Sequence, residues 1–320
     1  SMWKKLLSLT LCVSTLLLGG CGMTSNKIRF GTAALGGMYH SFGSAFTQLV
    51  STEDIDCQME MKTTAGSAAN LRLLSDGYIE LGIAQMDLTA DAYKGTGIFE
   101  GKEYQGFKAI AGLYTEACQI VVRADSSIHS LNDLQGKTIS IGEEDSGTER
   151  NANQILKASG LSSELVHTVN LDYAQAASQL QSGDIDTLFC TAGVQTTMID
   201  ELSRQCDIRL LSIDADCLDK LLQLNDCYST YTIPADTYNG QTEEVTTLGV
   251  QAVLLASDKL SEKTVEQLTK LLFSHAQDIQ YSIPVDLQMN ETSATQGITI
   301  PFHPGAAAYY AKQNIQVSTE

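Results

Sequence analysis

Short apolar runs alternate with amphipathic stretches along most of the chain. Runs typical of strands occupy 28–33, 57–64, 80–86 and 107–114. The segments between them, 38–51, 67–76 and 87–94, are predicted to be helices. The apolar residues of 38–51 recur at the spacing of one helix face, and they are Met38, Phe42, Ala45, Phe46, Leu49 and Val50. Strands and helices that alternate at these lengths predict parallel sheets covered by helices, the α/β class.

The same order of elements begins again in the second half of the chain. Residues 136–160 repeat the strand, glycine-containing loop and helix of residues 27–50. Helices are expected to end at Gly77 and at Gly183, because glycine readily adopts the left-handed conformation that terminates many helices. Each of these glycines precedes a buried strand. Two halves of like construction predict two similar α/β domains that face one another.

Two long extended runs are predicted to join these domains. Residues 112–125 are expected to cross from the first domain to the second, and residues 227–240 to cross back. Domain I is therefore expected to comprise 26–113 plus 232–320, and domain II 114–231. A domain interrupted by another and joined to it by two strands predicts a clamshell with a hinge.

The C-terminal part adds a strand and a helix to this pattern. Residues 246–257 are predicted to be a strand, and 261–283 one long helix with Ser261 as its N-cap. The apolar residues on one face of that helix recur at helical spacing, and they are Val265, Leu268, Leu272, Ala276 and Ile279.

The first 22 residues have the layout of a secretory signal. Lys4 and Lys5 stand near its start, an apolar run follows, and small residues precede Cys21. The letters LGGC at 18–21 resemble a lipobox, where bacterial lipoproteins are cut before a cysteine that is then acylated. We expect an exported chain, lipid-anchored through Cys21 on the outer face of the cytoplasmic membrane or in the periplasm. An uncleaved membrane anchor is the alternative.

Charge and cysteines narrow the function further. The formal net charge is −18, and such acidity opposes binding to nucleic acid because phosphates are repelled. Cys57, Cys118 and Cys190 lie in strand-like runs and are expected to be buried thiols, whereas one disulfide among Cys206, Cys217 and Cys227 is compatible with their spacing. No spacing of cysteines or histidines matches a zinc site, so neither metal nor cofactor is predicted.

Glycines and hydroxyls stand where helices begin. Ligands of parallel α/β sheets gather beyond the carboxyl ends of the strands, where helix N-termini favour an anion. Gly36 and Gly37 precede the first helix, Tyr39 lies at the mouth of the loop that contains them, and Ser146 and Thr148 occupy the equivalent loop of the second half. One small anion between the two loops is predicted, and a carboxylate is favoured because neither loop has a phosphate-binding motif. The alternatives are an ordinary turn and an ordinary helix cap.

Further polar residues follow the other buried strands. They are Thr64, Gly66, Ser67 and Asn70 after the second strand, Gln85 and Asp87 after the third, and Gly193 and Gln195 in the second half. Asp87 is expected either to cap the helix that follows or to contact a ligand ammonium group.

Catalytic patterns are missing from the sequence. The chain has no GxSxG motif and no histidine in a recognisable arrangement with a cysteine or serine. The acidic pairs Glu143–Glu144 and Glu243–Glu244 are adjacent in sequence, as solvated surface charges commonly are. A binding protein is therefore predicted rather than an enzyme.

Six ordered segments together resemble the TAXI family, the solute receptors of tripartite ATP-independent periplasmic (TRAP) transporters. The likeness extends from about residue 28 to 315, and its segments are GTAALGGMYHSFGSAF, TTAGSAANLRLLSDGYIELGIAQMD, LNDLQGKTISIGEEDSGTERNANQILKASGL, QAASQLQSGDIDTLFCTAGVQTTMIDEL, IPADTYNG and PFHPGAAAYY. The resemblance implies a type II periplasmic-binding-protein fold, with two similar parallel or mixed-sheet domains joined by two hinge strands.

The resemblance also implies a cleft, a solute and a partner. By position, the cleft loops of the family correspond to Gly37, Met38 and Tyr39, and to Ser146, Gly147 and Thr148. Family members are associated with glutamate, glutamine and dicarboxylates such as 2-oxoglutarate, and they deliver their solute to integral-membrane TRAP subunits. The chain departs from the family pattern within the expected pocket, at Ala33, Ala34, His40 and Ala65.

The sequence thus predicts a monomeric receptor that closes on a small carboxylate without making or breaking a bond. Two other functions stay open. An ABC-type amino-acid receptor has the same architecture, and a surface lipoprotein can report ligand occupancy to a signalling kinase.

Overall fold

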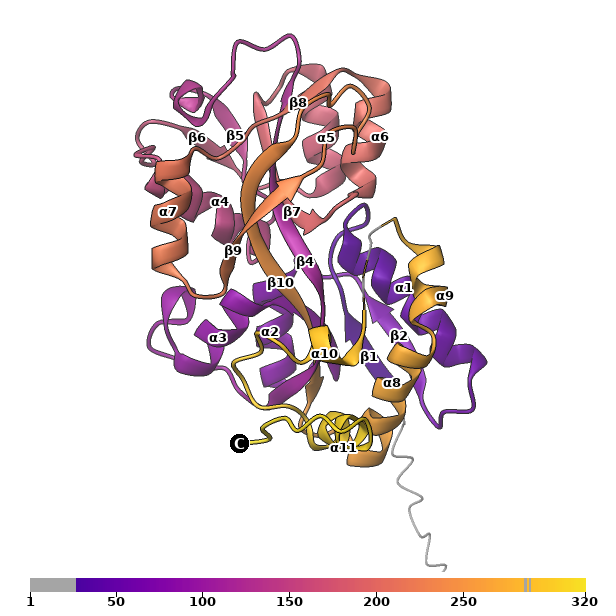
Figure 1. The fold of residues 1–320 in the computed structure, drawn as a ribbon. Coiled ribbons are helices and arrows are strands. Elements are labelled where there is room, and N and C mark those ends of the chain that lie inside the picture. The colour runs from indigo at the N-terminus through magenta and orange to yellow at the C-terminus, as the bar shows by residue number, and fades with distance from the viewer. Residues whose placement is uncertain (1–26, 285–286, 288) are drawn as a thin grey trace, which may run out of the picture.

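The computed structural model describes residues 27–284, 287 and 289–320, which form one mixed sheet flanked by helices (Figure 1). The predicted signal segment and Cys21 lie outside the described residues. Within the described part of the chain, no helix combines the length and the apolarity needed to span a bilayer.

The sheet consists of strands from both halves of the chain. In chain order they are β1 (Lys27–Gly31), β2 (Gln58–Lys62), β3 (Leu81–Gln85), β4 (Phe107–Arg123), β5 (Thr138–Ser140), β6 (His167–Val169), β7 (Thr187–Gly193), β8 (Ile208–Leu210), β9 (Tyr228–Ile233) and β10 (Val245–Ser257). The α-helices are α1 (Met38–Thr52), α2 (Ser67–Asp76), α3 (Met86–Lys94), α4 (Gly147–Ala158), α5 (Tyr173–Ser182), α6 (Thr197–Gln205), α7 (Ala215–Leu224), α8 (Glu262–Ser274), α9 (Ala276–Ser282), α10 (Glu291–Ala294) and α11 (Pro304–Lys312), and the 3-10 helices are η1 (Gly97–Phe99) and η2 (Leu131–Leu134).

The two halves of the sheet have the same topology. In the first half the parallel strands follow the order β2-β1-β3, and β10 pairs antiparallel with β3. In the second half the parallel strands follow the order β6-β5-β7, and β4 pairs antiparallel with β7. The predicted duplication and the α/β fold class are confirmed.

Local patterns predicted several elements closely. Helix α1 buries Phe42 and Phe46 fully, and their stacked rings lie 5.9 Å apart. Each such side chain stabilises the fold by roughly 1.5–3 kcal/mol through burial alone. Gly77 and Gly183 end α2 and α5 in the left-handed conformation, with φ of 82° and 86°.

Strands β4 and β10 run through both halves (Figure 1). On β4, Tyr114 belongs to the hydrophobic core of the first half and Ala117 to a core of the second. The second crossing was expected in 227–240, but β9 in that segment pairs with β10, and Ile233 packs in the second half. The chain returns through β10 instead, because its apolar residues continue into both cores. The expected domain boundaries stay a prediction.

Two further sequence expectations are corrected by the structure. The expected helix 261–283 is divided into α8 and α9 at His275, whose φ and ψ are −114° and 23°. Ser261 does cap α8, since its side chain accepts a hydrogen bond from the Thr264 amide. The cysteines of the described residues are free, including the three for which one disulfide was compatible with the spacing, Cys206, Cys217 and Cys227.

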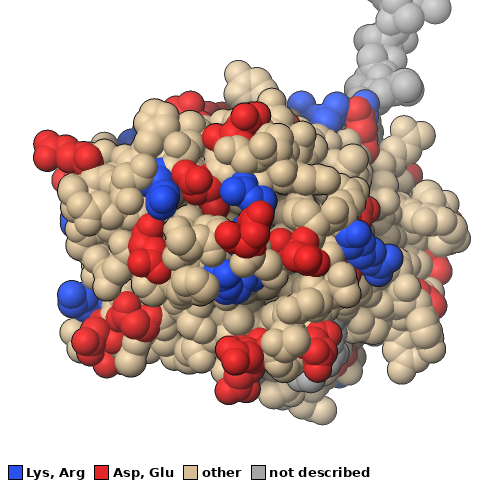
Figure 2. Space-filling view, turned by 90° about the horizontal axis from the view of Figure 1, so that it is seen from above, with Lys and Arg blue, Asp and Glu red and all other residues tan. Residues whose placement is uncertain are grey.

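Opposite charges are interspersed on the face of the molecule seen from above (Figure 2). Blue Lys and Arg side chains lie beside red Asp and Glu side chains over a surface that is mostly uncharged. Such mixing produces a weaker local field than the net charge of −18 alone suggests.

Candidate functional site

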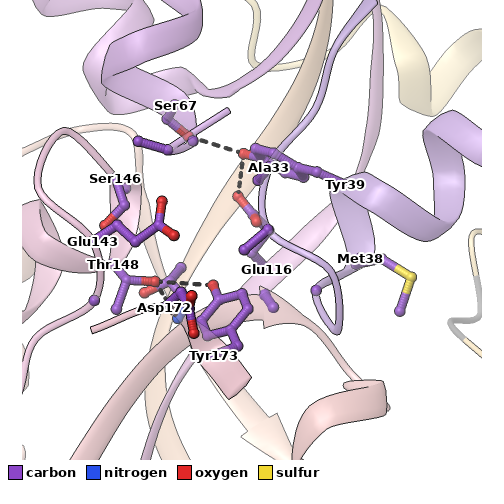
Figure 3. A pocket seen from close by; sticks show the side chains of 18 of the residues that line it. Ala33, Met38, Tyr39, Ser67, Glu116, Glu143, Ser146, Thr148, Asp172 and Tyr173 are labelled. Atoms are coloured by element: carbon purple, nitrogen blue, oxygen red, sulfur yellow. Dashed lines mark hydrogen bonds between the residues drawn. The ribbon is translucent and has the colours of Figure 1, made fainter. Parts of the chain in front are cut away.

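A small cavity lies between the two halves, at the carboxyl ends of the parallel strands (Figure 3). Its volume is about 30 Å³, and on the order of 10–15 Å³ of such volume holds one water molecule. The cavity is therefore large enough for about two waters. A larger solute enters only when the facing loops separate.

The first turns of five helices meet at this cavity. The lining residues at these starts are Gly37, Met38 and Tyr39 of α1, Gly66 and Ser67 of α2, Gln85 before α3, Ser146, Gly147 and Thr148 of α4, and Asp172 and Tyr173 of α5. The first amides of a helix have no acceptor within the helix, and the helix dipole makes this end electropositive. Their convergence suits the carboxylate of a solute.

The loops of the two halves touch across the cavity. Gly66 has φ of +129°, which favours glycine, and a Cβ placed there would lie 3.3 Å from the Ser146 Cα. The Ala69 amide donates a hydrogen bond to the Asp145 carbonyl at 3.1 Å, from one half to the other. Gly66 thus allows the backbones of the two loops to approach closely.

Glu116 lies at the centre of the site, on β4 where that strand passes between the halves. Only 2% of the residue is exposed. Its carboxylate accepts a hydrogen bond from the Tyr39 hydroxyl at 2.9 Å (Figure 3). Burial raises the pKa of the Glu116 carboxyl well above its usual value, while the Tyr39 hydrogen bond acts in the opposite direction.

Two short chains of hydrogen bonds hold the polar side chains in place. In the first half, the Tyr39 hydroxyl is 3.1 Å from Ser67 Oγ, which accepts a bond from the Gln85 amide. In the second half, the Tyr173 hydroxyl is 3.2 Å from Thr148 Oγ1, which accepts a bond from the Thr191 amide. The side chains that face the cavity are therefore positioned before a solute arrives.

The charged residues that line the cavity are all acidic: Glu116, Glu143 and Asp172. Partial burial and the nearby Asp172 raise the pKa of Glu143. None of the described lining residues is Lys, Arg or His. The arginines near the loops are engaged elsewhere, Arg72 with Asp145 and Arg150 with Asp91.

One buried acceptor at the cavity, Gln85 Oε1, has no hydrogen-bond partner, and its residue is 1% exposed. The buried Thr191 hydroxyl, which can donate as well as accept, interacts with the Cys118 thiol. An unmade hydrogen bond at Gln85 Oε1 costs about 1–3 kcal/mol. A solute that donates hydrogen bonds removes this penalty.

The structure brings most of the predicted site residues together. Those that line the cavity are Gly37, Met38, Tyr39, Gly66, Ser67, Gln85, Ser146, Gly147 and Thr148. Ser146 also caps α4, since its Oγ accepts a bond from the Glu149 amide at 3.0 Å. The side chain of Met38 points away from the other labelled side chains (Figure 3).

Other predicted residues lie outside the cavity lining. Asn70 is fully buried and its side-chain amide donates to the carbonyls of Thr32 and Ile83, while Thr64 Oγ1 donates to Asn70 Oδ1. Both residues therefore join strand ends beneath the loops.

The remaining predicted residues also lie outside the cavity lining, each in a different part of the structure. The Gly36 carbonyl accepts a bond from the Met198 amide of the other half at 3.0 Å. Gly193 ends β7 and pairs in register with Glu116. The Gln195 side chain donates to Asp200 Oδ1 at 2.7 Å.

Asp87 belongs to a buried polar network between the halves. Its Oδ2 accepts bonds from the Tyr228 hydroxyl at 2.7 Å and from Asn151 Nδ2 at 3.5 Å. Burial raises the pKa of Asp87, and the charge of Arg150 opposes that rise. Arg150 in turn pairs with Asp91 at 2.7 Å, so that α3 of one half is tied to α4 of the other.

Several lining residues were not predicted from the sequence. Glu116, Tyr173 and Thr191 are the main ones. Glu116 is a lone acidic residue inside a long apolar strand, which is a signal of a functional residue. The segment was predicted only to cross between the domains, so Glu116 was not identified. The described residues contain no group of three or more potential metal ligands.

Comparisons with known proteins give a family and a fold. Residues 30–313 match the NMT1-like family. A Xanthomonas citri protein bound to a chloride ion is 12% identical, with a TM-score of 0.51 over 84% of this chain and 94% of that one. An ancestral arginine-binding protein bound to arginine is 16% identical, with a TM-score of 0.50 over 80% of this chain and 96% of that one. The architecture is the type II periplasmic-binding-protein fold, as the sequence predicted.

Proposed function

The chain belongs to the NMT1-like family, and from this premise we propose that it is an exported receptor that captures a small carboxylate-bearing solute between its halves. The observation that carries the proposal is the convergence of five helix N-termini on one cavity between two similar half-sheets. Backbone amides and hydroxyls can bind a carboxylate there without a cation.

Binding is proposed to work by closure of the two halves. The solute enters while the loops are apart, and its contacts with both halves then favour the closed form. Interhalf contacts, such as Ala69 with Asp145 and Met198 with Gly36, form as the loops meet. The closed form is what membrane partners recognise, and no covalent chemistry takes place.

The proposed partners are the integral-membrane subunits of a TRAP transporter, which the resemblance to the TAXI family supports. The proposed attachment is a lipid on Cys21. The alternatives are an ABC-type receptor and a kinase-linked sensor, which also close two domains around a ligand. The genes next to the one that encodes this chain distinguish the three functions, because a multi-span permease pair, an ATPase and a sensor kinase differ in length and motifs.

The experiment that tests the receptor function is identification of the small molecules released when the purified protein is denatured. Mass spectrometry should find a small carboxylic acid at near-stoichiometric amount, and glutamate, glutamine and 2-oxoglutarate are the first expected. The same acids should raise the melting temperature in proportion to occupancy. If no molecule is released and no acid in the panel shifts melting, the proposal is wrong.

A further inference from the structure

Two glycines at the cavity have no space for a side chain, and in each case the nearest atoms belong to the opposite half. A Cβ at Gly37, in the first half, would lie 2.8 Å from Cε2 of Tyr173. A Cβ at Gly147, in the second half, would lie 2.5 Å from Cδ of Gln85 and 3.0 Å from Oγ of Ser67. Because two carbon atoms attract one another only at about 3.5–4.0 Å, contacts between carbons as short as these are repulsive.

The local backbone does not require glycine at either position. Gly37 is the N-cap of α1, and its φ of −97° and ψ of 169° are extended values that other residues adopt. Gly147 is the first residue of α4, and alanine favours a helix more than glycine does. Each half by itself would therefore accept alanine, and the need for glycine arises only where the halves meet.

The opposing side chains are held in place by their own contacts. The Tyr173 hydroxyl lies 3.2 Å from Thr148 Oγ1. Ser67 Oγ lies 3.1 Å from the Tyr39 hydroxyl and accepts a bond from the Gln85 amide at 3.1 Å. Gln85 is only 1% exposed, so its side chain has no open solvent to turn into. A methyl group at either glycine is therefore accommodated by separation of the halves.

We propose that Gly37 and Gly147 set the steric limit to closure, because their lack of a side chain lets the two halves come close enough to enclose the cavity. The inference rests on the proposed receptor function and adds the contacts that limit its conformational change. Alanine at either position holds the halves apart and leaves each half folded. The open form then predominates, and solute affinity falls because fewer molecules reach the closed form.

Two backbone amides report directly on closure. The Ala69 amide donates to the Asp145 carbonyl at 3.1 Å, from the first half to the second. The Met198 amide donates to the Gly36 carbonyl at 3.0 Å, from the second half to the first. Both amides lie in the first turn of a helix, α2 and α6, where the helix itself offers no acceptor. When the halves separate, both amides meet water and exchange their hydrogen faster.

Amide hydrogen exchange followed by NMR, in the wild type, Gly37→Ala and Gly147→Ala, tests the inference. It is measured without solute and with L-glutamine, L-glutamate or 2-oxoglutarate, and calorimetric titration gives the affinity for each acid. The amides of Ala69 and Met198 should both exchange faster in each variant than in the wild type. Any acid that the wild type binds should bind at least tenfold more weakly to each variant.

Gly305→Ala is the matched control, since it also places a methyl group near the start of a helix and against backbone atoms. Its clash with α8 lies within the first half and is present whether the halves are open or closed. It should therefore make the protein easier to unfold with urea. The affinity for the acids and the exchange of the Ala69 and Met198 amides should remain those of the wild type.

Three results overturn the inference. Exchange of both amides as in the wild type, with and without acid, means that the halves still close. Faster exchange of only the amide beside the substituted loop means a local distortion, because separation of the halves exposes both. An equal effect of Gly305→Ala on exchange and affinity means that the losses come from general instability.

Failure of the proposed function gives a different result. If no acid binds the wild type and no small molecule is released on denaturation, the proposed function is wrong. The exchange measured without solute still decides whether the two glycines limit closure.

Discussion

At the scale of single residues, Glu116 couples the stability of the fold to pH. Its pKa in the folded protein is raised by burial above the value in the unfolded chain. The folded state then binds the proton more tightly than the unfolded state does. The stabilisation is complete below the unfolded pKa and is lost as pH rises toward the folded pKa, by up to about 1.4 kcal/mol per pH unit.

We therefore expect Glu116→Gln to become more stable relative to the wild type as pH rises from 5 to 8. Urea unfolding of both proteins at the two pH values measures this difference. The other groups near Glu116 are present in both proteins, so their own titration largely cancels. Glu144→Gln, at an exposed position, is the control. The free energy of unfolding of Glu144→Gln should differ from that of the wild type by the same amount at both pH values. A difference between Glu116→Gln and the wild type that stays constant with pH would show that folding leaves the pKa of Glu116 unchanged.

The limits of prediction from sequence are also clearest at this scale. Gly37, Ser67 and Ser146 could be predicted because each stands where a strand ends and a helix begins. Glu116 could not be placed in the same way, since its strand was interpreted as a connection and its neighbours come from α1 and β7. Asn70 stands in an expected loop region, but its amide bonds to strand carbonyls.

At the scale of elements, Asn70 joins the ends of three strand segments. Its side chain donates to the carbonyls of Thr32 and Ile83 at 2.7 and 2.8 Å, and it accepts from Thr64. Asn70→Ala removes all three hydrogen bonds, although Thr64 Oγ1 still donates to the Thr32 carbonyl at 3.0 Å, and it should lower the free energy of unfolding by about 3 kcal/mol. Solute affinity of the folded fraction should change less than twofold. Chemical unfolding and calorimetry measure the two effects, with the exposed Asn153→Ala as control.

A large loss of affinity with unchanged stability in Asn70→Ala would instead mean that this side chain contacts the solute. The cavity lining does not include Asn70.

Helices α8 and α11 pack closely at Gly305. A Cβ at this position would lie 2.4 Å from the Glu262 carbonyl oxygen and 2.7 Å from the Glu266 nitrogen. Alanine normally favours a helix over glycine by about 1 kcal/mol. At Gly305 the clash between the new Cβ and the backbone of α8 should outweigh this gain in helix propensity. Gly305→Ala should therefore lower the free energy of unfolding by about 1–3 kcal/mol.

Thermal and urea unfolding of Gly305→Ala test the contact, and Ala308→Ser, at a half-buried position of the same helix, is the control. Stabilisation by Gly305→Ala would mean that the two helices separate easily. The sequence predicts neither α11 nor this contact, because the residues that meet there are distant in the chain.

At the scale of the whole molecule, the duplication was visible in the sequence because each half repeats the same strand, loop and helix order. The structure has the same 2-1-3 order of parallel strands in both halves. The return crossing was misplaced because β9 and β10 are both extended strands, and their pairing partners show which of them reaches both halves. Long-range pairing of this kind leaves no local pattern in the sequence.

The contact between α3 and α4 is expected to set how readily the halves close. Arg150 Nη2 lies 2.7 Å from Asp91 Oδ2, and the two side chains are only 9% and 17% exposed. Asp91→Asn keeps the shape but removes the charge, while Asp87 remains as a partial counter-charge for Arg150. A loss of about 1.4 kcal/mol in the closed form lowers its population relative to the open form tenfold, and with it the apparent solute affinity.

We expect Asp91→Asn to bind about tenfold more weakly than the wild type, with the same order of preference among solutes. Small-angle scattering without solute should give a larger radius of gyration, because the halves are apart more often. Arg204→Gln breaks an ion pair within one helix of one half and should change neither quantity. If Asp91→Asn behaves like Arg204→Gln, the ion pair does not contribute to closure. If it instead alters which solutes bind, the network reaches the cavity, and closure and recognition depend on the same residues.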